Sequence, residues 1–117
     1  MAKTILVIDD DPVVVKYLES LLQDNGYETL TASSSKEAMD VLKKTKPDLM
    51  TLDLEMPGGW GTQLYRQMTK DENLSDIPVI VVSGMAGRHA IQKAVAYVAK
   101  PFDPDKLIAI VRKAIGG

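Results

Sequence analysis

Continuous apolar runs alternate with amphipathic stretches along this chain. The run Ile5–Ile8 contains no polar position, which is typical of a strand buried on both faces. Four further strands are predicted at residues 27–32, 49–52, 77–82 and 97–99. Five amphipathic helices are predicted between and after the strands, the fourth of them a short one at residues 88–94. This alternation indicates an α/β protein whose parallel sheet is covered by helices on both faces.

Start and stop signals delimit several of the predicted helices. Asp11-Pro12 and Asp103-Pro104 each place an aspartate N-cap before a proline at the first helical position. Ser34 and Glu37 have the spacing of a capping box, and Asn25-Gly26 is expected to end the first helix.

Length, composition and charge narrow the function classes. The chain has 117 residues, 45% of them hydrophobic, so one domain over residues 1–117 is expected. It contains no cysteine, which excludes disulfides, thiolate metal sites and cysteine catalysis. The net charge is −2 and the basic residues are scattered, so direct binding of nucleic acid is not expected. We find neither a signal peptide nor an apolar run of about 20 residues, and we expect a cytoplasmic protein that does not contact membranes.

Polar side chains follow four of the five predicted strands. Asp9 and Asp10 follow the first strand, Asp53 the third, Ser83 the fourth and Lys100 the fifth. Each residue alone has an ordinary explanation as a cap, a turn residue or a solvated charge. Because parallel strands end at the same edge of a sheet, we expect all of these side chains to meet there. Their convergence predicts a binding or reaction site.

The clustered aspartates require a compensating charge. Two carboxylates about 4 Å apart repel each other by roughly 4 kcal/mol at an effective dielectric constant of about 20. Asp9, Asp10 and Asp53 form an oxygen-rich set that suits a hard divalent cation, of which Mg²⁺ is the most available. Mg²⁺ is suited to phosphoryl transfer, and Ser83 and Lys100 supply a hydroxyl and an ammonium for phosphoryl oxygens. One carboxylate would then be the nucleophile that forms an aspartyl phosphate.

Four motifs resemble a known family. ILVIDDDP, DLEMPGG, VVSG and YVAKPF are together similar to the response-regulator receiver domain of two-component signalling, over the full length of the chain. The resemblance implies a flavodoxin-like, doubly wound sheet of five parallel strands in the order 2-1-3-4-5 with five helices. Sixteen residues separate Ser83 from Lys100, fewer than the family usually has, which implies a shortened fourth helix.

The resemblance also implies roles at the acidic end of the sheet. Asp53 matches the phosphoacceptor. Asp10 and Asp53 would ligate Mg²⁺ directly, together with the backbone carbonyl of Glu55, and Asp9 would act through a water molecule. An acidic Glu55 adds negative charge near the site, at a position where family members tune dephosphorylation.

Further roles are implied for the last two strands. Ser83 and Lys100 would bind phosphoryl oxygens, and Tyr97 matches the aromatic residue that rotates when the hydroxyl engages phosphate. The peptide between Lys100 and Pro101 is expected to be cis. Trp60 is unusual for the family and is expected in the loop or first helical turn after the third strand.

The resemblance implies partners as well. A histidine kinase or a phosphotransfer protein would donate the phosphoryl group, and a downstream protein or a fused output domain would receive the signal. Self-dephosphorylation would be slow, so the domain is not expected to be an enzyme. The short fourth helix removes part of a face that many family members use to dimerise, and we expect a monomer.

Three alternatives remain open. The spacing of Asp9, Asp11 and Val13 also fits haloacid-dehalogenase-type phosphatases, in which Asp9 would be the nucleophile and Asp11 the acid–base. That fold is usually longer, and it leaves Asp53 without a role. A receiver-like binding module that is not phosphorylated is a second alternative. A flavin-binding protein is a weaker one, because the acids would repel a flavin phosphate.

Overall fold

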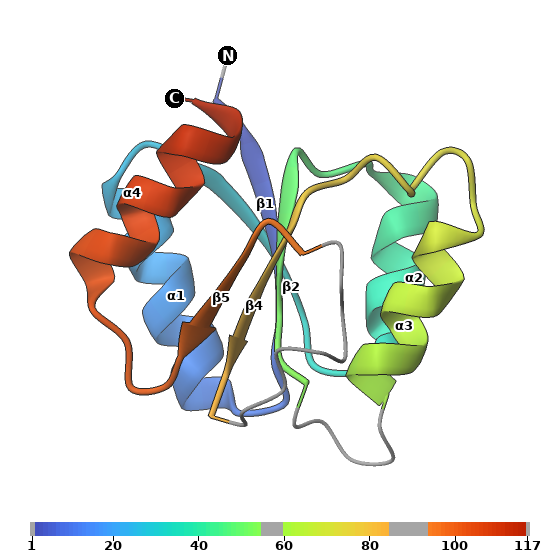
Figure 1. The fold of residues 1–117 in the computed structure, drawn as a ribbon, viewed down its shortest axis with the longest axis horizontal. Helices are drawn as coiled ribbons and strands as arrows, with labels where there is room; N and C mark the ends of the chain where they lie inside the picture. The colour runs from blue at the N-terminus through green and yellow to red at the C-terminus, as the bar shows by residue number, and fades with distance from the viewer. Residues whose placement is uncertain (1, 55–59, 85–93, 117) are drawn as a thin grey trace.

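The computed structural model describes residues 2–54, 60–84 and 94–116, with the backbone alone at Trp60. The described part folds into a five-stranded parallel sheet in the order β2-β1-β3-β4-β5, with helices on both sides (Figure 1). The strands are β1 (Thr4–Ile8), β2 (Glu28–Ala32), β3 (Leu49–Leu52), β4 (Val79–Ser83) and β5 (Ala96–Ala99). The helices are α1 (Pro12–Asp24), α2 (Ser35–Lys44), α3 (Trp60–Thr69) and α4 (Pro104–Ile115). The predicted parallel sheet and its strand order are confirmed.

The number of helices differs from the expectation. The described residues contain four helices, not five. The short fourth helix was expected at residues 88–94, and residues 85–93 lie outside the described part, so that helix stays a prediction. None of the helices in the described ranges is long and apolar enough to cross a membrane.

Two apolar layers hold the helices on the sheet. Strand residues alternate between the faces: Leu6 and Ile8 face α2 and α3, whereas Ile5 and Val7 face α1 and α4. All four are almost fully buried, as expected for a central parallel strand. Both faces are therefore committed to packing, and the ends of the strands are left for polar groups.

The helix ends follow the predicted capping signals, with one variation. Asp11 caps α1 through Val13 N and Asp103 caps α4 through Asp105 N, each at 2.9 Å. Ser34 accepts from Glu37 N at 3.1 Å, as a capping box requires. The Glu37 carboxylate reaches one residue further back than expected and accepts from the Ser33 hydroxyl at 2.6 Å.

Several strand boundaries differ from the prediction: β1 begins at Thr4, β5 begins at Ala96 and β4 ends at Ser83, each one residue beyond the predicted bound. Two further differences lie at the starts of β4 and β2. β4 begins at Val79 instead of residue 77, because Pro78 has no amide hydrogen to donate to a neighbouring strand. The carbonyl of Pro78 still accepts from Met50 N at 3.0 Å, so the chain enters the sheet there. β2 begins at Glu28, one residue later than expected, and Tyr27 instead packs into the layer under α1 and α4.

Candidate functional site

The carboxyl ends of β1 and β3 bring Asp9 and Asp53 side by side. Ile8 pairs with Leu52 in the β1–β3 register, so the next residue of each strand lies at the carboxyl edge. Asp53 N donates to Ile8 O at 3.0 Å and Asp9 N donates to Ala32 O at 3.2 Å, which extends the sheet pattern by one residue. Both side chains are buried, with 1% and 3% of Asp9 and Asp53 exposed. Their positions are therefore set by backbone pairing in the centre of the sheet.

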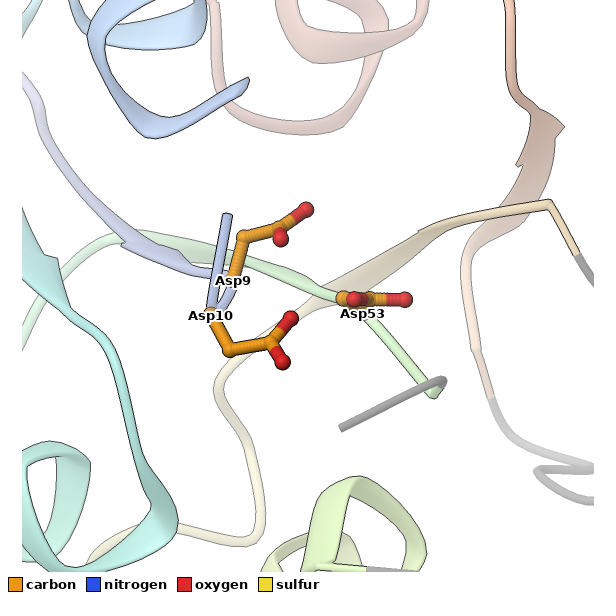
Figure 2. Close-up of side chains that lie close together, drawn as sticks. All are labelled: Asp9, Asp10 and Asp53. Carbon is orange, nitrogen blue, oxygen red and sulfur yellow. The ribbon is translucent and has the colours of Figure 1, made fainter. Parts of the chain in front are cut away.

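Asp10 completes the acidic cluster from the solvent side. Asp9, Asp10 and Asp53 each offer a carboxylate oxygen, and these oxygens lie within 4.8 Å of one another. Figure 2 shows the three side chains directed toward a common region beyond the strand ends. Asp10 is exposed, whereas the other two are buried. The predicted cluster is thus assembled, and only one of its members faces water.

The donor set fits a hard divalent cation. It consists of carboxylate oxygens alone, which Mg²⁺ prefers over nitrogen or sulfur. Three carboxylates at this spacing also repel one another, and a cation between them relieves the repulsion. The predicted contribution of the Glu55 carbonyl lies outside the described residues.

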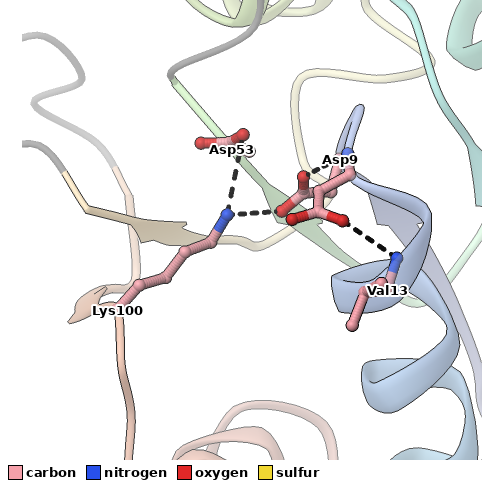
Figure 3. A network of polar contacts seen from close by, with 5 residues as sticks. Asp9, Val13, Asp53 and Lys100 are labelled. Carbon is pink, nitrogen blue, oxygen red and sulfur yellow. Dashed lines mark hydrogen bonds and ion pairs between the residues drawn. The ribbon is translucent and has the colours of Figure 1, made fainter.

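Lys100 brings a positive charge into the same cluster. Its Nζ lies 2.6 Å from Asp9 Oδ2 and 3.7 Å from Asp53 Oδ2. Both contacts are drawn as dashed lines in Figure 3. Lys100 N donates to Ser83 O at 3.1 Å, and the Lys100–Pro101 peptide is cis, as expected. The lysine side chain reaches the two buried aspartates from the end of β5. Part of the negative charge is therefore offset from within the protein.

Asp11 stands apart from the cluster. Its carboxylate accepts from Val13 N and caps α1, and its side chain is exposed. Its own backbone N–H donates to Asp9 Oδ1 at 2.9 Å. Asp9 therefore has one oxygen bound by the start of α1 and the other paired with Lys100. The interpretation of Asp11 as an N-cap is confirmed.

Ser83 lies at the same edge of the sheet. It ends β4, is 3% exposed and pairs in register with Ala99, the residue before Lys100. Since β4 is the neighbour of β3, Ser83 lies one strand away from the strand that Asp53 follows. The structure thus brings all five polar residues that follow predicted strands to one edge.

Tyr97 has a buried hydroxyl for which no hydrogen-bond partner occurs among the described residues. Its half-buried ring packs on the apolar layer shared with Tyr65 of α3. Burial, and then the electrostatic influence of Tyr97, raise the pKa of Tyr65 above its ordinary value of 10.0.

A cleft borders the exposed side of the cluster. Its volume is about 290 Å³, and it lies between α1 and the β2–α2 connection. Asp9 and Asp10 form one wall, while Lys16, Glu19 and Glu37 lie along the others. Asp10 can therefore be approached from solvent. Trp60 begins α3, as predicted, and its side chain lies outside what the structure describes.

The sequence matches the response regulator receiver domain family over residues 5–112. Protein Rrf1 of Nitratidesulfovibrio vulgaris is 35% identical over 116 residues, which cover 98% of this chain and 84% of that protein.

Solved structures share the fold. Response regulator TrrA of Thermotoga maritima, in complex with Mg²⁺ and BeF, has a TM-score of 0.86 and 33% identity, covering 96% of this chain and 98% of that one. The signal receiver domain of a signal transduction histidine kinase from Syntrophus aciditrophicus has a TM-score of 0.87 and 28% identity, covering 99% and 92% of the two chains.

Proposed function

Because the chain belongs to the response regulator receiver domain family of two-component signalling, we propose that Asp53 accepts a phosphoryl group from a histidine of a kinase or phosphotransfer protein. The observation that carries this proposal is the position of Asp53. It directly follows β3, between the acidic residues that follow β1 and the Ser83 end of β4. Its carboxylate therefore faces both the predicted metal ligands and Lys100.

The transfer replaces one bond to phosphorus with another. The P–N bond of the phosphohistidine breaks while a P–O bond to an Asp53 carboxylate oxygen forms. The electron pair of the broken bond stays on the imidazole nitrogen of the donor. Asp53 is 97% buried. This burial keeps water away from the acyl phosphate that forms on its carboxylate.

Asp10 and Asp53, with the Glu55 carbonyl, are proposed to hold Mg²⁺ directly, and Asp9 through a water molecule. The acidic cluster and the Mg²⁺ in the related Thermotoga maritima structure support this assignment. When bound, the cation would neutralise negative charge on the phosphoryl oxygens. The exposed Asp10 is the member that an arriving hydrated cation would meet first.

Ser83 and Lys100 are proposed to hold the phosphoryl oxygens. Lys100 Nζ already lies 3.7 Å from Asp53, so a small side-chain movement brings it to a group on that carboxylate. Tyr97 is proposed to turn when Ser83 engages the phosphoryl group. A buried hydroxyl without a partner costs about 1–3 kcal/mol, which favours conformations that hydrate it.

Receiver domains of this family are signalling domains, and this one is proposed to pass its state to a downstream protein or a fused output domain. Residues 1–117 are proposed to form a single receiver domain, and residues 5–112 match the family. Slow self-dephosphorylation, a monomeric state after activation and a cytoplasmic location remain predictions. Sedimentation with and without beryllofluoride tests the monomer, and an activation-dependent dimer would contradict it.

Two observations weigh against the phosphatase alternative. That chemistry needs Asp11 as an acid–base beside Asp9, yet the Asp11 carboxylate is exposed and caps α1. Asp9 itself is bound on both oxygens, by Asp11 N and by Lys100 Nζ. The Asp11 carboxylate is therefore not placed to act as an acid–base for Asp9, which disfavours the phosphatase.

Phosphorylation with acetyl phosphate and Mg²⁺, borohydride trapping and peptide mass spectrometry test the proposal. We expect the label on Asp53 and none in Asp53→Asn. Asp11→Asn is the matched control, because asparagine also serves as an N-cap and labelling should persist. A label on Asp9 with rapid multiple turnover would support the phosphatase instead.

A further inference from the structure

Gly61, the second residue of α3, lies against the peptide that follows Asp53. A Cβ atom built on Gly61 would be 2.5 Å from Asp53 O and 3.1 Å from Leu54 Cα. Cβ atoms in proteins essentially never come within 3.0 Å of such atoms. The first turn of α3 thus rests directly on the backbone of Asp53, and only glycine permits this approach.

Neither side of this contact can yield easily. Asp53 N is bound to Ile8 O in the centre of the sheet. On the other side, Leu64 and Met68 anchor α3 in the apolar core, with 0% and 2% of their surface exposed. A side chain at position 61 must therefore displace the Asp53–Leu54 peptide, the start of α3, or both.

We propose that Gly61 is a positioning residue for Asp53. By admitting the α3 backbone to the Asp53 carbonyl, it sets the direction of the Asp53 carboxylate relative to Asp9 and Asp10. This inference rests on the proposed role of Asp53 as metal ligand and phosphoacceptor.

The size of the expected displacement makes the proposal testable. Moving the contact from 2.5 Å to 3.0 Å requires a shift of at least 0.5 Å. Functional groups must be held within about 0.5 Å of their productive geometry. A single methyl group at position 61 therefore requires a displacement as large as the whole range within which the site residues must be held.

Gly61→Ala tests this role, with Gly26→Ala as the matched control. Gly26 has φ +91° and no atom within 4 Å of a built Cβ, so alanine there strains the backbone far from the acidic cluster. Thermal unfolding should show that both variants are less stable than the parent. Titration calorimetry with MgCl₂ alone should show an affinity about tenfold weaker for Gly61→Ala, the scale seen when supports of metal ligands are removed.

Gly26→Ala should keep the parental Mg²⁺ affinity within about twofold, since a purely structural loss does not move the ligands. Equal affinities for folded Gly61→Ala and the parent would overturn the proposal. If Gly61→Ala is too unstable to titrate, all three proteins are compared in about 1 M trimethylamine N-oxide, which strengthens burial. A parent that binds Mg²⁺ but is never labelled on Asp53 would overturn the proposed function, while the affinity comparison would still decide the role of Gly61.

Discussion

Lys100 Nζ lies 2.6 Å from a carboxylate oxygen of Asp9 and 3.7 Å from one of Asp53. The lysine proposed to bind a phosphoryl group on Asp53 is thus paired more closely with a different acid. Asp9 is also a proposed second-sphere ligand of the cation. Binding of Mg²⁺ and movement of Lys100 toward Asp53 are therefore expected to be coupled, because both involve the Asp9 carboxylate.

Lys100→Met removes the internal positive charge from this cluster. We expect lower stability without Mg²⁺, because two buried aspartates lose their cation, and a larger rise in melting temperature on adding Mg²⁺. Differential scanning calorimetry with and without MgCl₂ measures both effects. Lys46→Met breaks only the exposed pair with Asp76 and should leave the Mg²⁺ response unchanged. A smaller Mg²⁺ response in Lys100→Met would show that the lysine does not compete for the acids.

Asp10→Asn removes the exposed member of the acidic cluster. Without metal we expect a stability gain of up to about 1 kcal/mol, because a repelling charge near water is lost. With saturating Mg²⁺ the parent should be the more stable protein, since Mg²⁺ binding stabilises its folded state more than that of the variant. Urea unfolding at low and high MgCl₂ distinguishes the two contributions. Identical Mg²⁺ stabilisation of parent and variant would exclude Asp10 as a ligand.

Thr51 is a buried residue of β3 whose hydroxyl has no hydrogen-bond partner in the described part of the chain. Thr51→Val replaces that hydroxyl with a methyl group of similar size. We expect a stability gain of about 1 kcal/mol, because the desolvation cost disappears. Thr29→Val is the control: its hydroxyl accepts from Gln23 Nε2 at 2.9 Å, so no gain is expected. A destabilised Thr51→Val would indicate an internal water molecule at that position.

The raised pKa of Tyr65 predicts that the stability of the fold depends on pH in the alkaline range. Its pKa is raised by burial and by Tyr97, so the folded state holds the phenolic proton more tightly than the unfolded chain. The resulting stability is present below the ordinary pKa of 10.0 and is lost as pH rises through the higher folded value. Tyr65→Phe should therefore lose less stability than the parent between about pH 9 and 11, measured as urea midpoints. The effect should be small because Tyr65 is only partly buried. Parallel curves for the two proteins would refute it.

Much of this protein could be predicted from local sequence. Buried parallel strands are uninterrupted apolar runs, and Ile5–Ile8 is one, so its place inside the sheet follows from its composition. Asp11-Pro12 predicts the start of α1 for an equally local reason, since the cap and the first turn involve neighbouring residues. The convergence of Asp9, Asp53 and Lys100 also followed, because parallel strands share a carboxyl edge. The strand order itself came from the resemblance of four motifs to a family.

Only the tertiary structure decided which of these groups touch. Lys100 lies 91 residues from Asp9 in the chain, and no periodicity indicates that it pairs more closely with Asp9 than with Asp53. The contact of Gly61 with the Asp53 carbonyl likewise depends on how α3 is anchored by its buried residues on the sheet. Periodicity reports which face of an element is apolar, and caps report where an element ends. Distances of a few ångströms between strand ends depend on register, helix packing and side-chain rotamers together, and these are settled only when the whole chain packs.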